Sequence, residues 1–154
     1  MLKRIKYVSR FAKPLGPHEV TRLAELSAAN NQKLGITGVL MSSGGMFFQI
    51  IEGPPEHVDA LYRNIGADER HTNVLLLGSE DNVERRLFPD WSMKKIDLDD
   101  RADARLDPLK TILETIIVQH QLMENLTQTL ERATNRWQMR TPSIASVLHE
   151  SPPQ

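Results

Sequence analysis

Three polar side chains fall in stretches of the sequence that otherwise look like hydrophobic core. Gln49 stands between Phe48 and Ile50. Tyr7 lies in the first strand-like run, and Asn31 lies at the end of the first helix-like run. An amide that is buried without a partner costs about 1–3 kcal/mol, so we expect Gln49 to have a buried polar partner. A Tyr, an Asn and a Gln that meet in one apolar slot can hydrogen-bond a planar heterocycle.

Each of these residues also has an ordinary structural interpretation. A tyrosine is common at surfaces, an asparagine near a helix end, and a glutamine on an edge strand. The run 47–53 favours the binding interpretation for Gln49. Phe48 and Ile50 would lie on one face of this strand, and Gln49 would lie between apolar neighbours on the other. A strand that is apolar on both faces is buried on both, which predicts that Gln49 is buried.

Hydrophobic periodicity predicts the elements that position these residues. It indicates a strand at 3–9, a helix at 17–31 that ends near Gly35, a hairpin of strands 36–41 and 46–52, a second helix from Pro55, and strands from 74 and at 91–96. This βαββαββ order predicts an α+β, ferredoxin-like sandwich over residues 1–98. We expect a mixed five-stranded sheet with both helices on one face.

Residues 103–136 are predicted to form one long amphipathic C-terminal helix. The candidate seam consists of Leu109, Ile116, Met123 and Leu130, alternating with Leu106, Leu113, His120 and Thr127. Two interpretations stay open: the helix folds back over the free face of the sheet, or it pairs with a second copy as a coiled coil. Residues 137–154 contain several prolines and are predicted to be a linker or a disordered tail.

Composition excludes several classes of function. The chain has 154 residues, a net charge of −1 from 19 basic and 20 acidic side chains, and no cysteine. Nucleic acid and anionic membrane are therefore not expected as partners. No apolar run reaches the ~18–20 residues that span a bilayer, and no signal peptide is evident, so a cytoplasmic location is expected. The histidines lack metal-ligand spacing, and Glu52 has no partner for catalysis.

Several short segments, taken together and in order, closely resemble the BLUF family, the blue-light sensors that use flavin. The resemblance covers about residues 2–98, and the combination of segments is highly specific. The segments are Tyr7-Val8-Ser9, Asn30-Asn31, Ile36-Thr37-Gly38, Phe47-Phe48-Gln49-Ile50-Ile51-Glu52-Gly53, Asp68-Glu69-Arg70-His71 and Trp91-Ser92-Met93.

This resemblance implies non-covalent FAD and a role for each matching residue. Tyr7 would donate an electron and a proton to the photoexcited flavin. Gln49 would hydrogen-bond Tyr7 and the flavin, and then change its tautomer or orientation. Asn31, with Asn30 beside it, would hold the polar edge of the ring. The other expected cofactor neighbours are Ser9, Phe48, Trp91 and Met93, with Arg70 and His71 near the ribityl-phosphate end.

The predicted function is that of a blue-light photoreceptor with no catalytic activity of its own. Its red-shifted signalling state would act on the C-terminal helix through the strand that carries Trp91 and Met93. The sequence does not decide which of these two side chains points toward the flavin. The helix resembles the connector of BLUF-type photoactivated adenylyl cyclases. The chain would thus be a short sensor with a downstream protein partner, or the sensor fragment of a protein with a fused effector. We expect a homodimer through 103–136.

Two other classes of function remain as alternatives. One is a flavin-dependent reductase or oxidase, although the chain has no dinucleotide-binding glycine fingerprint. The other is a flavin-free, ferredoxin-like module that dimerises through the long helix.

Overall fold

The protein is described by a computed structural model that covers residues 1–100 and 104–140. Its elements in chain order are β1 (Leu2–Phe11), α1 (Pro17–Leu34), β2 (Thr37–Ser43), β3 (Met46–Gly53), α2 (Pro55–Ala67), β4 (His71–Val83), β5 (Lys94–Asp97), a short 3-10 turn (Ala104–Leu106) and α3 (Asp107–Arg140). The predicted βαββαββ order with a long C-terminal helix is confirmed.

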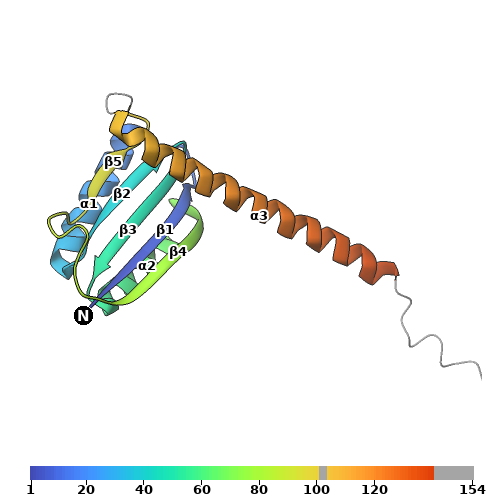
Figure 1. The fold of residues 1–154 in the computed structure, drawn as a ribbon, viewed down its shortest axis with the longest axis horizontal. Coiled ribbons are helices and arrows are strands. Elements are labelled where there is room, and N and C mark those ends of the chain that lie inside the picture. The colour runs from blue at the N-terminus through green and yellow to red at the C-terminus, as the bar shows by residue number, and fades with distance from the viewer. Residues whose placement is uncertain (101–103, 141–154) are drawn as a thin grey trace, which may run out of the picture. The chain divides into compact units, whose positions relative to one another are not determined.

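The strands form a five-stranded sheet in the order β4-β1-β3-β2-β5. β1 pairs antiparallel with β3 and β4, β2 pairs antiparallel with β3, and β2 pairs parallel with β5, so the sheet is mixed as predicted. Helices α1 and α2 lie on the same face of the sheet (Figure 1). Strands β1 and β3 are central, and their register places Tyr7 opposite Gln49.

The hydrophobic core fills the space between the sheet and these two helices. The sheet contributes alternate residues, because successive strand side chains point to opposite faces. The helices contribute residues spaced by a whole turn or two. The main core residues are Ile5, Tyr7, Val20, Ala24, Ile36, Leu40, Phe47, Ile51, Val58, Ile65 and Met93. Tyr7 and Gln49 therefore point into the layer between sheet and helices.

Two element boundaries differ from the predicted ones near the site. Helix α1 continues past Asn31 to Leu34 and ends where Gly35 takes the left-handed conformation, with φ of 65°. The Asn31 side chain is buried and bonds elsewhere, so it does not end the helix. Strand β5 begins at Lys94 and not at Trp91, because the Trp91 carbonyl accepts a bond from Gly38 outside the regular ladder.

Strand β4 is a long and irregular edge of the sheet. It begins at His71, earlier than predicted, and its pairing with β1 shifts register at three places. Asn73 and Asn82 have positive φ values of 50° and 57°. Irregularities of this kind twist and interrupt a strand edge.

The chain divides into two compact units. Met1–Leu113 includes the sheet and the first turns of α3, and the described part of α3 from Glu114 onward belongs to the second. Leu113 is buried, at 2% exposure, whereas Leu122 and Met123 are more than half exposed at 62% and 61%. The helix continues to Arg140, into the predicted tail, and residues 141–154 lie outside the described residues. Among the residues that the structure describes, no helix combines the length and the apolar character needed to cross a membrane.

Candidate functional site

Gln49 has the buried polar partner that its place in the sequence predicts. The Tyr7 hydroxyl donates a hydrogen bond to Gln49 Oε1. Gln49 Nε2 donates to Met93 Sδ at 3.3 Å. All three side chains are buried. A thioether sulfur is a weak acceptor, so one strong and one weak bond hold the amide in this orientation.

Aromatic side chains and helix residues seal Tyr7 from solvent. The ring of Tyr62 meets the Tyr7 ring edge-on, with centroids 5.6 Å apart, and the His71 ring lies at 6.5 Å. Burial raises the pKa of Tyr7 well above its ordinary value, and the nearby Tyr62 and Asp68 add to this rise. The hydroxyl is therefore protonated at physiological pH, and it can lose its proton only to an acceptor within the site.

Asn31 fixes the segment that carries Met93. Its Nδ2 donates to the Ser92 carbonyl at 2.9 Å, and the Gly38 N–H donates to the Trp91 carbonyl at 2.7 Å. A Cβ at Gly38 would lie 2.1 Å from the Ile50 carbonyl oxygen, so a larger residue there would push β2 and β3 apart. These two bonds hold residues 91–92 against α1 and β2.

His71 begins β4, Arg70 directly precedes it, and both line the same cavity as Gln49. Ser9 Oγ lies 2.7 Å from His71 Nδ1, and the His71 ring also packs on Phe47 at 5.2 Å. Burial lowers the pKa of His71, a shift that Asp68 partly opposes and Arg70 reinforces, which favours the neutral imidazole. Arg70 donates to the Asp68 carboxylate through Nε at 3.0 Å, and its side chain is 51% exposed.

A cavity of about 240 Å³ opens beside Gln49. Its apolar lining is Leu23, Leu40, Leu61 and Ile65, and its polar lining includes Ser27, Asn30, Asn31, Gln49, Asn64, Asp68, Arg70 and His71. Apolar walls suit the faces of a planar heterocycle, and amides that both donate and accept suit its polar edge. The residues present therefore fit a flavin ring. Arg70 lines the cavity as well, with its guanidinium paired to the Asp68 carboxylate.

Half of the predicted cofactor neighbours are in the lining of this cavity and half are not. The absent ones are Tyr7, Ser9 and Met93, which are buried beside Gln49 or His71, and Phe48 and Trp91. Phe48 lies next to Gln49 on β3 and so points to the opposite face of the sheet. Trp91 is 39% exposed and stacks on Phe88, with centroids 5.5 Å apart. The sequence left open whether Trp91 or Met93 points toward the site, and in this structure Met93 contacts Gln49.

Residues that the sequence did not single out also contribute to the site. Leu23 and Ser27 line the cavity from α1, and Leu61 lines it from α2. A signal for them exists, because Leu23, Ser27 and Asn31 follow at four-residue helical spacing, which places them on one face. Val58, Leu61, Tyr62 and Ile65 likewise follow helical spacing, which places Tyr62 on the apolar face of α2. Its contact with Tyr7 carried no signal, since it depends on how α2 is placed on the sheet.

The described part of the chain holds no group of three histidine, cysteine or acidic side chains placed to bind a metal.

Comparison with solved structures gives close matches to light-regulated proteins. A bacterial light-regulated adenylyl cyclase superposes with a TM-score of 0.76 and 42% identity, covering 81% of this chain and 36% of that one. The BLUF protein BlrB, in its dark state, matches with a TM-score of 0.59 and 38% identity, covering 62% of this chain and 72% of that one.

Sequence comparison points the same way. The β subunit of the photoactivated adenylate cyclase of Euglena gracilis is 32% identical over 122 residues, which cover 77% of this chain. The chain spans only 13% of the length of that relative. The sequence model of the BLUF family, described as sensors of blue-light using FAD, matches residues 2–94. The chain therefore belongs to the BLUF family of flavin-binding blue-light sensors.

Proposed function

We propose that this chain senses blue light through FAD bound in the cavity beside Gln49, and that Tyr7 and Gln49 carry out the photochemical step. One observation carries the proposal. The Tyr7 hydroxyl, the Gln49 amide and the Met93 sulfur form one buried chain of hydrogen bonds, and Gln49 also lines the cavity. An amide that both donates and accepts can pass a proton and then take a second orientation.

The residues of the chain perform distinct parts of this step. When bound, the flavin supplies an oxidant that light makes strong enough to take an electron. Tyr7 gives up one electron, and its hydroxyl proton passes along the hydrogen bond to Gln49 Oε1. The electron and a proton then return to Tyr7, so the tyrosine is restored. The lasting change is in the tautomer or orientation of the Gln49 amide.

The rearranged amide acts on the segment that leads to β5. A change at Gln49 Nε2 breaks its weak bond to Met93, which directly precedes β5. The chain after β5 reaches α3 through the ion pair of Asp99 and Lys110, at 3.1 Å. This route would carry the signal from the cavity to the start of the C-terminal helix.

The substitution Tyr7→Phe tests the photochemical role. The variant should bind flavin as the wild type does but show no reversible red shift, in absorption spectra taken in darkness and after blue light. Tyr62→Phe is the matched control, since it removes a hydroxyl from the neighbouring ring and should keep the photocycle. A normal red shift in Tyr7→Phe would refute the mechanism.

The same spectra separate this proposal from the alternatives. A flavin spectrum without a red shift, accompanied by steady oxidation of NAD(P)H, would favour a reductase or oxidase. A colourless protein that cannot be reconstituted with FAD would favour the flavin-free module.

We further propose that two copies pair along α3. Leu109, Ile112, Met123, Leu126 and Leu130 are all at least 40% exposed. Their spacing gives a seam with 3-4 periodicity. Leu113 is buried, so Ile112 and Leu126 replace Leu113 and Thr127 in the seam that the sequence suggested. Leu126→Glu should make the protein monomeric in sedimentation, while Thr127→Glu, at the next position, should not.

The output of the signal is also a proposal. Two of the three proteins compared above are adenylyl cyclases, and this chain covers only 13% and 36% of their length. We propose that this chain has no catalytic activity of its own, acts in the cytoplasm, and hands its signal to a fused effector or a partner protein. Measuring cyclase activity of the chain alone, in light and darkness, tests the first of these statements.

A further inference from the structure

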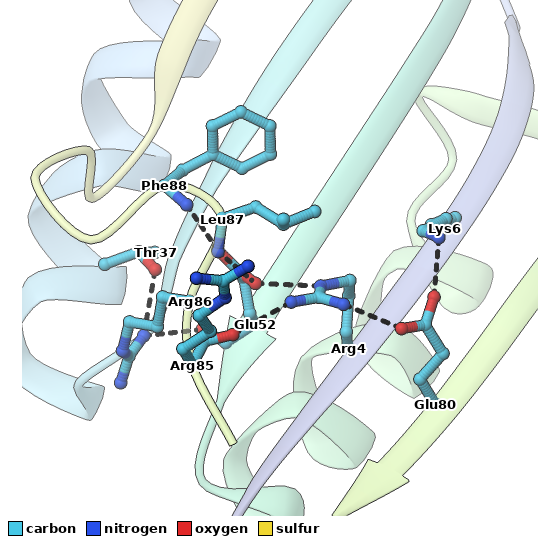
Figure 2. A network of polar contacts seen from close by, with 9 residues as sticks. All are labelled: Arg4, Lys6, Thr37, Glu52, Glu80, Arg85, Arg86, Leu87 and Phe88. Atoms are coloured by element: carbon cyan, nitrogen blue, oxygen red, sulfur yellow. Dashed lines mark hydrogen bonds and ion pairs between the residues drawn. The ribbon is translucent and has the colours of Figure 1, made fainter. Parts of the chain in front are cut away.

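A second buried polar network lies on the other face of β3, centred on Glu52. The Glu52 side chain is fully buried, at 0% exposure. Glu52 and Gln49 are three residues apart and so lie on opposite faces of the strand. The Glu52 carboxylate accepts bonds from Arg4 Nε at 2.9 Å, from the Leu87 N–H at 3.1 Å and from the Phe88 N–H at 2.7 Å. Figure 2 shows these three groups around the carboxylate.

Arg4 links this carboxylate to two other parts of the molecule. Its Nη1 donates to Glu80 at 2.7 Å, and its Nη2 donates to the Arg85 carbonyl at 3.0 Å. Lys6 reaches the other oxygen of Glu80. The guanidinium therefore joins β1, β3, β4 and the segment that follows β4, and its three donor groups all have partners (Figure 2).

Arg86 fastens the same segment to the loop before β2. Its Nη1 donates to Thr37 Oγ1 and to the Glu52 carbonyl, both at 2.9 Å, and its Nη2 donates to the Gly35 carbonyl at 2.6 Å. Residues 85–88 thus have four anchoring points, two through backbone N–H groups, one through a carbonyl and one through a side chain.

These anchors hold the segment 84–93, which connects β4 to β5 and includes Met93, the neighbour of Gln49. Residues 84–93 form neither helix nor strand. Their beginning is held by Glu52 and Arg86. Their end is held by Gln49 at Met93, and by Asn31 and Gly38 at residues 91–92. One strand, β3, therefore contributes to holding both ends of the segment, with a neutral amide on one face and a buried carboxylate on the other.

We propose that Glu52 is a positioning residue of the light switch, which holds residues 87–88 fixed so that a change at Gln49 moves Met93 and β5 and is not absorbed upstream. This inference rests on the proposed function. The Glu52 side chain does not line the cavity beside Gln49, so it would act through the segment. With this anchor and the bonds of Asn31 and Gly38 to residues 91–92 in place, displacement of Met93 passes into β5 and not into the residues before Phe88.

Two substitutions release the anchor in different ways, and a third is the control. Glu52→Gln replaces the buried carboxylate by an amide of the same shape. Arg86→Gln removes the bonds to Thr37, Gly35 and the Glu52 carbonyl without altering the Glu52 carboxylate. Arg85→Gln removes the same charge one residue away, where the side chain is exposed and the network uses only the backbone carbonyl.

Hydrogen exchange of the flavin-loaded chain, in darkness and under blue light, measures where the signal goes. In the wild type and in Arg85→Gln, light should change exchange in residues 94–97 and leave the Leu87 and Phe88 amides protected. In Arg86→Gln and Glu52→Gln, the change at 94–97 should shrink and the change at 84–88 should grow, while the flavin red shift persists. In these two variants the lit state should return to the dark state at least about threefold faster than in the wild type. The reason is that a segment released at one end is less constrained and rearranges more easily.

The outcomes separate the two proposals. If Arg86→Gln keeps the wild-type pattern of exchange and the wild-type recovery rate, the role of the anchor is refuted, even if Glu52→Gln proves too unstable to study. If the wild-type chain shows no red shift, the proposed function itself fails, and the inference fails with it. A uniform rise of exchange throughout the sheet in both variants would show a merely structural role and would also refute the inference.

Discussion

The two faces of β3 carry polar networks of opposite character. On the helix-covered face, Gln49 joins neutral groups, the Tyr7 hydroxyl and the Met93 sulfur. On the other face, Glu52 joins the charged Arg4 and two backbone N–H groups. Bonds to a charged partner are roughly twice as strong as bonds between neutral groups. A single strand therefore carries an amide that can change its hydrogen-bond partners and a carboxylate whose loss of partners costs much more free energy.

Because of this difference in bond strength, we expect the Glu52 face to stabilise the fold and the Gln49 face to carry the reversible change. Breaking a buried ion pair leaves an uncompensated charge, so the Glu52 face should determine whether the fold persists. Rearranging a neutral amide exchanges bonds of about 1 kcal/mol, which is small enough for a reversible signal. The predictions below are ordered by their expected effect on the free energy of unfolding.

Arg4→Met should produce the largest loss, about 3–5 kcal/mol, because it leaves Glu52 charged and buried without its ion-pair partner. Urea unfolding of the wild type and the variant measures this loss. Lys6→Met is the control, since it removes a charge from the same network at a side chain that is 35% exposed, and it should cost about 0–1 kcal/mol. An equal loss of unfolding free energy in Arg4→Met and Lys6→Met would contradict the stabilising role assigned to the buried Glu52 ion pair.

Gln49→Leu should cost less, about 1–3 kcal/mol, because it leaves the buried Tyr7 hydroxyl without its acceptor. It should nevertheless abolish the red-shifted state completely. Adding Tyr7→Phe should recover much of the lost stability, since both partners are then apolar. A red-shifted state that survives in Gln49→Leu would place the switch elsewhere.

Met93→Leu should change the free energy of unfolding by less than about 1.5 kcal/mol, because it conserves volume in the core. The red shift should persist, but dark recovery should change by a few-fold, since the Gln49 Nε2 acceptor is lost. Met46→Leu is the matched control, because Met46 is also buried but lies at the start of β3. If the two variants recover at the same rate, the Met93 sulfur has no part in the switch.

The smallest expected effect is a pH dependence from His71. Burial lowers its pKa below the ordinary 6.5, so unfolding takes up a proton once the pH falls below about 6.5. The stabilisation is fully present above that pH and declines as the pH falls toward the folded-state pKa. His71→Asn should flatten this part of the stability profile relative to the exposed His18→Asn control. Identical profiles for the wild type and His71→Asn would show that His71 does not contribute.

The sequence was sufficient for the fold and for the central contact of the site. The order of strands and helices follows from hydrophobic periodicity, and the burial of Gln49 follows from its apolar neighbours. Strand alternation could also have placed Phe48 on the face away from the cavity. The match of Tyr7 to Gln49 needed the register of β1 against β3, which the family resemblance supplied and periodicity alone did not.

Two features could not be predicted from the sequence. Nothing in the sequence decides between Trp91 and Met93 at the site, and the stacking of Trp91 on Phe88 depends on an irregular segment. The partners of Glu52 are Arg4, far away in the sequence, and two backbone N–H groups of the same irregular segment. Backbone groups carry no sequence signal, so an anchor of this kind becomes visible only in three dimensions.

The irregular edge strand β4 has a consequence for the behaviour of the protein at high concentration. Its exposed side chains include Leu76 and Leu77, and a regular edge with such residues would recruit the edge of a neighbouring molecule into a continuous sheet. The three register shifts and the left-handed Asn73 and Asn82 interrupt that edge. These interruptions disfavour the addition of a strand from a neighbouring molecule at this edge, which is the step by which fibrils grow.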